Sequence, residues 1–182
     1  MTTAAKDAVL LARVADGDHD AFTEVMRAHE DRVFSVCLRI MGDREKALDA
    51  TQETFLTAFR KAHQFEGKST FGTWVYRIAV NTCYDQLRKQ KRRPSEPMPD
   101  YFDPADASAQ EAVEAAGIRP ELQEALSSLS PEFRSAIVLS DIEGMSLPEA
   151  AETLGVPVGT MKSRVFRGRR LLAQHLGNQN TT

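Results

Sequence analysis

The chain has 182 residues, of which 42% are hydrophobic and 27% charged, as in a globular protein with one large or two small domains. It has no apolar run long enough to span a bilayer and no signal-peptide pattern at its start, so a cytoplasmic protein without membrane insertion is expected. The net charge of −3 is unevenly spread, with net +3 in residues 1–93, net −6 in 94–121 and net 0 in 122–182. The overall acidity therefore does not exclude a nucleic-acid partner.

Apolar residues spaced three and four apart predict a four-helix domain in residues 1–93. Gly42 is expected to end the second helix, and Asp43 can cap the third. The loop FEGKST, residues 65–70, separates the third helix from the fourth. The predicted helices span about 6–16, 18–41, 44–63 and 71–92.

The third predicted helix carries two opposite stripes. An apolar stripe is expected to enter the core and comprises Leu48, Thr51, Phe55, Ala58, Phe59 and Ala62. The other stripe is polar with an exposed leucine in its middle and comprises Asp49, Gln52, Glu53, Leu56 and Arg60. Such a stripe fits a protein-docking face and fits solvated surface equally well. Periodicity alone leaves both interpretations open.

The fourth predicted helix is strongly basic. One polar face is formed by Arg77, Asn81, Tyr84 and Arg88, and further cations follow at Lys89, Lys91, Arg92 and Arg93. The helix dipole alone favours some cations at this end, but five within six residues exceed what a cap requires. The preceding loop places Lys68, Ser69 and Thr70 beside the aromatic residues Phe65, Phe71 and Trp74. Such a loop could hold an unstacked base against aromatic rings.

Residues 94–121 are rich in proline and acids and are predicted to be a flexible linker. A smaller helical unit is predicted in residues 122–182. There, a capping box from Ser146 to Glu149 opens a short helix that closes at Gly155, and a basic helix follows. A short helix, a glycine-containing turn and a second helix are typical of a helix-turn-helix.

The last predicted helix, residues 158–172, contains five cations and no acid. Helical geometry predicts a narrow buried stripe of Val158, Met161, Val165, Gly168 and Leu172. The opposite side carries Thr160, Ser163, Phe166, Arg167 and Arg170, flanked by Lys162, Arg164 and Arg169. A helix fits the major groove, ~12 Å wide, where arginine binds guanine and an aromatic ring can touch a thymine methyl group. The flanking cations suit phosphates. A merely solvated face would normally include acids, so DNA contact is favoured.

The other reactive side chains indicate neither catalysis nor metal binding. Cys37 and Cys83 lie on apolar helix faces and are interpreted as buried, inert thiols in preference to a redox pair. The four histidines show no ligand spacing, and there is no carboxylate cluster or nucleophile–base pair. We therefore expect no metal, no cofactor and no enzymatic activity.

Together these motifs resemble the bacterial extracytoplasmic-function (group IV) RNA polymerase sigma factors over residues 9–93 and 122–175. The segment LDATQETFLTAFRKAHQF resembles the region that docks on the clamp helices of the polymerase β′ subunit. The segment STFGTWVYRIAVNTCYDQLRK resembles the part that opens and reads the −10 element. The stretch from LSPEFRSAIVL to KSRVFRGRRLL resembles the region that reads the −35 element and meets the β-subunit flap.

The resemblance implies roles for individual residues. The polymerase-docking motif is matched by Asp49, Gln52, Glu53 and Phe55, with Leu56 beside them, although Ala50 and Thr51 replace its usual bulky aliphatics. Contact with the −10 element is implied for Lys68, Ser69, Trp74, Arg77 and Asn81, with Arg88 on the same face, and loop 65–70 would select the flipped base. Contact with the −35 element is implied for Lys162, Ser163, Phe166 and Arg167, with Arg164 and Arg170 beside them.

The expected molecule is all-α, with a four-helix domain in 1–93 and a helix-turn-helix domain in 122–182 joined by the acidic, proline-containing linker. Its expected partners are the RNA polymerase core, promoter DNA and an anti-sigma factor. The main alternative is a stand-alone helix-turn-helix regulator whose N-terminal domain senses a ligand or dimerises. It leaves the basic fourth helix and its aromatic loop unexplained. An enzyme acting on nucleic acid is a weaker alternative, because no catalytic cluster supports it.

Overall fold

The computed structural model describes residues 3–91, 117 and 119–179, and every regular element within these residues is a helix. The all-α prediction is therefore confirmed. The N-terminal unit comprises α1 (Thr3–Ala15), α2 (His19–Met41), α3 (Arg44–Lys61), the 3-10 turn η1 (Ala62–Gln64) and α4 (Phe71–Lys91). The C-terminal unit comprises α6 (Pro120–Ser127), α7 (Pro131–Ile137), the π-helical turn η2 (Val138–Ile142), α8 (Leu147–Leu154) and α9 (Val158–Gln179).

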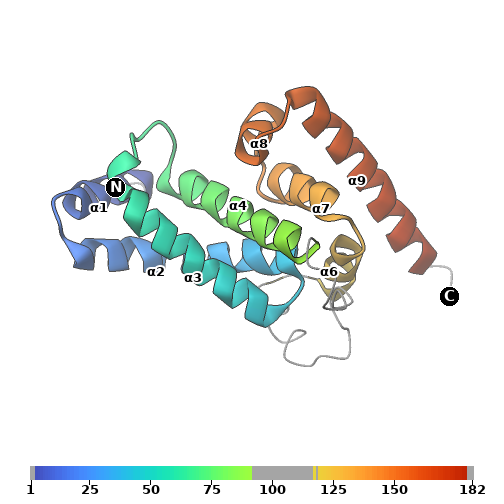
Figure 1. Cartoon of the computed structure of the whole chain (residues 1–182), viewed down its shortest axis with the longest axis horizontal. Helices are drawn as coiled ribbons and strands as arrows, with labels where there is room; N and C mark the ends of the chain where they lie inside the picture. Colours follow the sequence, from blue (N-terminus) through green and yellow to red (C-terminus); the bar gives the residue numbers. More distant parts are fainter. Residues whose placement is uncertain (1–2, 92–116, 118, 180–182) are drawn as a thin grey trace.

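The helix ends follow the capping residues of the sequence. The side chain of Asp18 accepts a hydrogen bond from the Ala21 amide at the start of α2, and Asp43 does the same for Lys46 at the start of α3. Gly42 ends α2 in the left-handed conformation, with φ 69°. These caps fix the short α2–α3 connection, so the two helices run back alongside each other (Figure 1).

The N-terminal unit is a bundle in which α2, α3 and α4 all contact one another and α1 packs across α2. Its core is made of aliphatic and aromatic side chains that are almost fully buried, among them Val25, Val33, Leu38, Ile40, Phe71, Val75 and Val80. Cys37 and Cys83 meet inside this core as free thiols. The hydrogen bond with Cys37, together with burial, raises the pKa of Cys83 well above its ordinary value, so this thiol stays protonated. The prediction of buried thiols is confirmed.

Three residues expected in the core are exposed instead. Leu48 and Phe59 of α3 are 36% and 38% exposed, and Val158 at the start of α9 is 47% exposed. On α3 the small residues Ala47, Ala50 and Ala58 lie inward, which lets α3 approach its neighbours closely and turns the larger Leu48 and Phe59 toward the edge of the contact. Helical periodicity predicted α3 correctly, but it centred the buried stripe on the side of Leu48 and Phe59, whereas the observed stripe is rotated toward the alanines.

In the C-terminal unit α9 lies along α7 and also contacts α6 and α8 (Figure 1). The centre of the unit holds a fully buried arginine, Arg134 of α7. Its guanidinium donates hydrogen bonds to the backbone carbonyls of Leu126, Ser127 and Leu129, at and just after the C-terminal end of α6. A cation is favoured at a helix C-terminus because the last carbonyls lack intrahelical donors.

The two units pack against each other at the C-terminal end of α2. Arg134 also donates to the Ile40 carbonyl, and the buried Gln123 side chain donates to the carbonyls of Leu38 and Arg39. Helices α7 and α8 contact α4, which in Figure 1 lies on the side of the N-terminal unit that faces the C-terminal unit. The predicted linker, 94–121, falls mostly outside the described residues, and its last two positions already belong to α6.

Candidate nucleic-acid and protein interfaces

The helix-turn-helix of the C-terminal unit is built by α8 and α9. Ser146 accepts the Glu149 amide while the Glu149 carboxylate accepts from the Ser146 amide, so the predicted capping box is present. Gly155 ends α8 with φ 63°, and α9 begins three residues later. Met161 and Val165 fix α9 to the core, with exposed fractions of 0% and 5%. The side of α9 opposite Met161 and Val165 therefore points away from the unit.

The outward side of α9 carries the residues predicted for the −35 element. Phe166 is 69% exposed, so an apolar ring lies among the cations on this side of α9. The side chain of Arg164 is half-buried and its Nη1 atom has no hydrogen-bond partner, so Arg164 lies at the edge of this surface. The exposed members are Lys162, Ser163, Phe166, Arg167 and Arg170.

The loop before α4 forms an aromatic cluster. The Trp74 ring lies 5.4 Å from the Phe65 ring and 5.7 Å from the Phe71 ring, measured between centroids, and is only half-buried. The Thr70 hydroxyl accepts the Thr73 amide at 3.2 Å and thereby starts α4. Of the two polar residues predicted to contact the −10 element here, Lys68 is exposed beside Glu66 and Ser69 is half-buried.

The polar face of α4 is only partly free. Asn81 and Arg88 are exposed, and the Arg88 guanidinium lies 5.6 Å from the centre of the Tyr84 ring. Arg77 is half-covered by the C-terminal unit, with its Nη1 atom 4.0 Å from a Glu152 carboxylate oxygen of α8. Its Nε atom is buried without a hydrogen-bond partner. The cations predicted at 91–93 lie outside the residues whose side chains are described.

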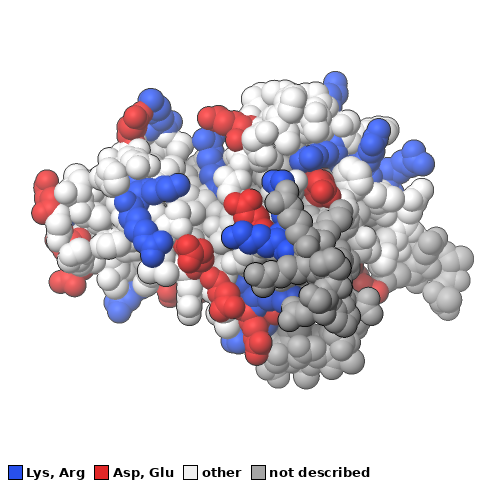
Figure 2. Space-filling model, in the orientation of Figure 1, with Lys and Arg blue, Asp and Glu red and all other residues white. Residues whose placement is uncertain are grey.

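The predicted docking stripe on α3 is exposed at Asp49, Gln52, Glu53 and Leu56. Phe55 is 6% exposed and lies in the core, as its place in the apolar stripe predicted, and the docking role that the resemblance implies for it stays a prediction. The exposed Leu48 and Phe59 add apolar area that periodicity assigned to the core. Figure 2 shows acidic side chains in a row over α3, on the face turned to the viewer. We call Leu48, Asp49, Gln52, Glu53, Leu56 and Phe59 the α3 stripe.

A groove of ≈ 600 Å³ runs between α3 and α4. It is lined on one side by Asp49 and Glu53 and on the other by Asn81, Asp85 and Lys89. The α3 stripe and the polar face of α4 therefore share an edge, which the sequence could not reveal because the two segments lie on different helices.

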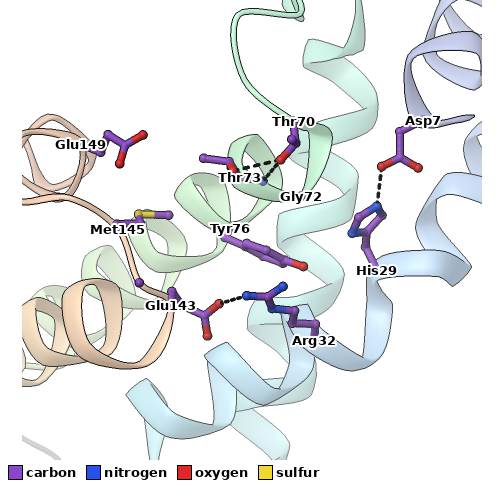
Figure 3. A pocket seen from close by; sticks show the side chains of 11 residues that line it. Asp7, His29, Arg32, Thr70, Gly72, Thr73, Tyr76, Glu143, Met145 and Glu149 are labelled. Carbon is purple, nitrogen blue, oxygen red and sulfur yellow. Dashed lines mark hydrogen bonds and ion pairs between the residues drawn. The ribbon is translucent and has the colours of Figure 1, made fainter. Parts of the chain in front are cut away.

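A second cavity, of ≈ 550 Å³, lies between the two units (Figure 3). The carboxylate of Glu143 accepts hydrogen bonds from Arg32 at 2.9 Å and Arg39 at 3.4 Å, and its side chain is only 2% exposed. The Arg32 guanidinium also lies 4.8 Å from the centre of the Tyr76 ring, and burial raises the pKa of Tyr76. Sequence reasoning missed this cluster, because Glu143 lies more than 100 residues from Arg32 and Arg39 and none of them belongs to a local motif.

Among the described residues no group of three or more His, Cys, Asp or Glu side chains could hold a metal ion. None of the described helices is long and apolar enough to cross a membrane.

Comparisons with known proteins match both units. Residues 25–93 match the model of sigma-70 region 2, and residues 119–172 match the model of sigma-70 region 4. The chain is 39% identical over 173 residues to the ECF RNA polymerase sigma factor SigE of Mycolicibacterium smegmatis, covering 92% of this chain and 67% of that protein. It is 33% identical to the ECF RNA polymerase sigma factor SigW of Bacillus subtilis, covering 91% of this chain and 94% of that protein.

Solved structures agree with these matches. CnrH in complex with the cytosolic domain of CnrY aligns with a TM-score of 0.66 and 27% identity, over 95% of this chain and 98% of CnrH. The sigma factor RpoE of Bartonella quintana, in complex with the anti-sigma factor NepR, aligns with a TM-score of 0.68 and 28% identity. That alignment covers 86% of this chain and 96% of RpoE.

Proposed function

The chain belongs to the ECF family of RNA polymerase sigma factors, and we propose that its two units divide promoter recognition between them. Residues 1–93 dock on the polymerase β′ clamp helices through the α3 stripe and hold the melted −10 strand with loop 65–70 and α4. Residues 122–182 read the −35 duplex with α9 and meet the β-subunit flap. One observation carries the proposal: two separate cationic faces, on α4 and α9, accompany an exposed acidic and apolar stripe on α3.

Reading of the −35 element falls to the outward side of α9. The exposed Arg167 presents a planar fork of donors that matches the guanine edge in the major groove, and Phe166 can pack on a thymine methyl group. Lys162 and Arg170 are placed for phosphates, which fix the register of the helix without reading sequence.

Arg167→Ala is expected to cost about 1–3 kcal/mol of binding to the selected −35 duplex and little on scrambled DNA, because a base contact is lost. Lys162→Ala, which removes an exposed cation of α9 placed for a phosphate, should weaken both duplexes alike. Titration of both variants against both duplexes measures the difference. Equal losses on the two duplexes for Arg167→Ala contradict its assignment to base reading.

The half-buried Trp74 and its two aromatic neighbours form the proposed platform for an unstacked −10 base. Stacking of a base on an aromatic ring contributes about 1–3 kcal/mol. The exposed Lys68 and Asn81 would supply further polar contacts to the −10 strand.

Promoter binding requires the C-terminal unit to move away from α4. In the closed arrangement of this structure Arg77 is half-covered by α8, and Glu143 is held between Arg32 and Arg39. The 26 residues of the proposed linker that precede α6, 94–119, can extend to about 90 Å, which spans more than two helical turns of DNA. After the two units separate, the chain can therefore still bind the −10 and −35 elements at the same time.

Glu143→Arg is expected to open the closed arrangement, because it places a third cation beside Arg32 and Arg39 in a buried position. Small-angle scattering should show a larger radius of gyration. The free protein should also bind the single-stranded −10 segment of a selected promoter about tenfold more tightly. Glu121→Arg makes the same charge change at an exposed residue of α6 and controls for general electrostatic attraction. A radius unchanged from the wild type would contradict the closed resting state.

The deciding experiment for the whole proposal is transcription from a selected promoter library by purified protein and polymerase core. A sigma factor starts transcription in this system, whereas a stand-alone helix-turn-helix regulator does not. We further propose that the protein is a non-enzymatic initiation factor that acts in the cytoplasm under an anti-sigma factor. Complexes of CnrH with CnrY and of RpoE with NepR support the last point.

A further inference from the structure

One cation of α9, Arg169, is already paired with a carboxylate of the same protein. Arg169 donates two hydrogen bonds to Asp141, from Nε to Oδ2 at 2.9 Å and from Nη2 to Oδ1 at 2.6 Å. Asp141 lies in η2, between α7 and α8, and its Oδ1 atom also accepts from the Ser140 hydroxyl at 3.1 Å. The hydrogen bonds from Arg169 lower the pKa of Asp141, so the carboxylate stays charged at neutral pH. A two-point contact of this kind restricts rotation as well as distance.

The residue before Arg169 brings α9 unusually close to α7. A Cβ atom on Gly168 would lie 2.8 Å from Cγ1 and 3.1 Å from Cδ1 of Ile137. Only glycine therefore allows this approach without displacing the Ile137 side chain. Gly168 sets the separation of the two helices, and the adjacent Arg169–Asp141 pair sets how α9 is turned about its own axis.

The rotation of α9 matters because Arg167 lies about 160° around the helix from Arg169, at 100° per residue. Arg169 holds one side of α9 to the protein, and Arg167 projects on the opposite, exposed side. A small rotation of the helix moves the Arg167 fork sideways in the groove. Bidentate base contacts do not tolerate such a shift, because both hydrogen bonds must be aligned at once.

We propose that Asp141 is a positioning residue for −35 recognition: it fixes the rotation of α9 through Arg169 and keeps the Arg169 guanidinium off the DNA. This inference rests on the proposed reading of the −35 element by α9. Asp141 occupies the Nε and Nη2 donors of Arg169 and offsets its charge, so we expect Arg169 to add little to phosphate binding in the wild-type complex. The five-cation helix then presents four cations to DNA, from Lys162, Arg164, Arg167 and Arg170.

The test uses the full chain, a −35 duplex selected by the wild type from a randomised pool, and a scrambled duplex of the same composition. The variants are Asp141→Ala, Asp141→Asn and Arg169→Gln, with Glu121→Ala as a control that removes one exposed acid of the same unit. Two quantities are measured: the ratio of the two affinities, and the slope of log affinity against log salt concentration. The slope counts phosphate contacts at about 0.9 per contact, so a merely structural role of Asp141 would leave it unchanged.

Asp141→Ala is expected to lower the affinity ratio about tenfold and to steepen the salt slope by about 1, because the freed Arg169 gains a phosphate. Arg169→Gln should lower the ratio with the wild-type slope, and Glu121→Ala should change neither quantity. Asp141→Asn keeps the shape of the side chain and should give the same two changes as Asp141→Ala. It provides the test if the alanine variant does not fold. An affinity ratio that is unchanged in both Asp141 variants would overturn the proposal. A salt slope that becomes shallower by about 1 in Arg169→Gln would also overturn it, because Arg169 would then already contact a phosphate in the wild type. If the wild type itself fails to prefer its selected duplex, the reading of the −35 element by α9 is wrong.

Discussion

Glu53→Arg is expected to weaken association with the RNA polymerase core at least a hundredfold, about 3 kcal/mol. Glu53 is exposed near the middle of the α3 stripe, between the exposed Gln52 and Leu56, and it also lines the groove to α4. Reversal of a charge at the centre of an interface removes the favourable pairing and adds repulsion between like charges. The apolar contacts of Leu56 cannot offset that loss, because the new cation must be desolvated next to them.

Association is measured by the amount of core polymerase retained on immobilised protein across a concentration series. Glu30→Arg makes the same charge change at an exposed residue of α2, outside the α3 stripe, and should retain wild-type binding. Binding of the −35 duplex by α9 should be the same in both variants, which shows that the C-terminal unit is intact, and an unchanged circular dichroism melting curve shows that the N-terminal helices remain folded. Undiminished retention of polymerase by Glu53→Arg would remove the α3 stripe as the docking surface.

Arg134→Met is expected to lower the free energy of unfolding by about 3–5 kcal/mol, because two or three buried carbonyl acceptors lose their only donor. Arg134 is fully buried and donates to four backbone carbonyls, those of Leu126, Ser127, Leu129 and Ile40. A buried ion pair can be replaced whole by apolar side chains, but backbone carbonyls cannot be mutated away. Methionine fills much of the space but offers no donor, and each buried carbonyl left unpaired costs about 1–3 kcal/mol. The Leu126 carbonyl keeps a second donor, the Leu129 amide, so the loss stays below the sum over all four acceptors.

Denaturant unfolding followed by circular dichroism measures the loss, and Arg27→Met serves as the control at an exposed arginine of α2, with an expected change within about 0.5 kcal/mol. Arg134→Lys should fall between the wild type and Arg134→Met, since an ammonium group keeps the charge but lacks the planar fork. Because one of the four acceptors belongs to α2, Arg134→Met should also weaken the packing between the two units. A loss below about 1 kcal/mol would show that the carbonyls find other donors.

The sequence by itself determined the helices and most of their outward faces. Caps such as Asp43, Gly42 and the Ser146–Glu149 box act within a few residues, so the pattern that predicts them is also the interaction that stabilises them. The same holds for the exposed side of α9, where Phe166 and Arg167 lie where helical geometry placed them. Local physics is sufficient there, because both the helix and its buried stripe repeat at short, regular spacings.

Only the tertiary structure decided which side chains of a helix face are buried and which charged residues pair with them. Phe55 is buried while Leu48 and Phe59 are exposed, because alanines on α3 set how closely it approaches its neighbours. Arg77 is half-covered by Glu152, and Arg169 is taken up by Asp141, through contacts between residues far apart in the chain. Such contacts depend on the relative placement of whole helices, to which many side chains contribute at once. No short pattern in one segment encodes them, so the availability of each cation for DNA had to come from the packed structure.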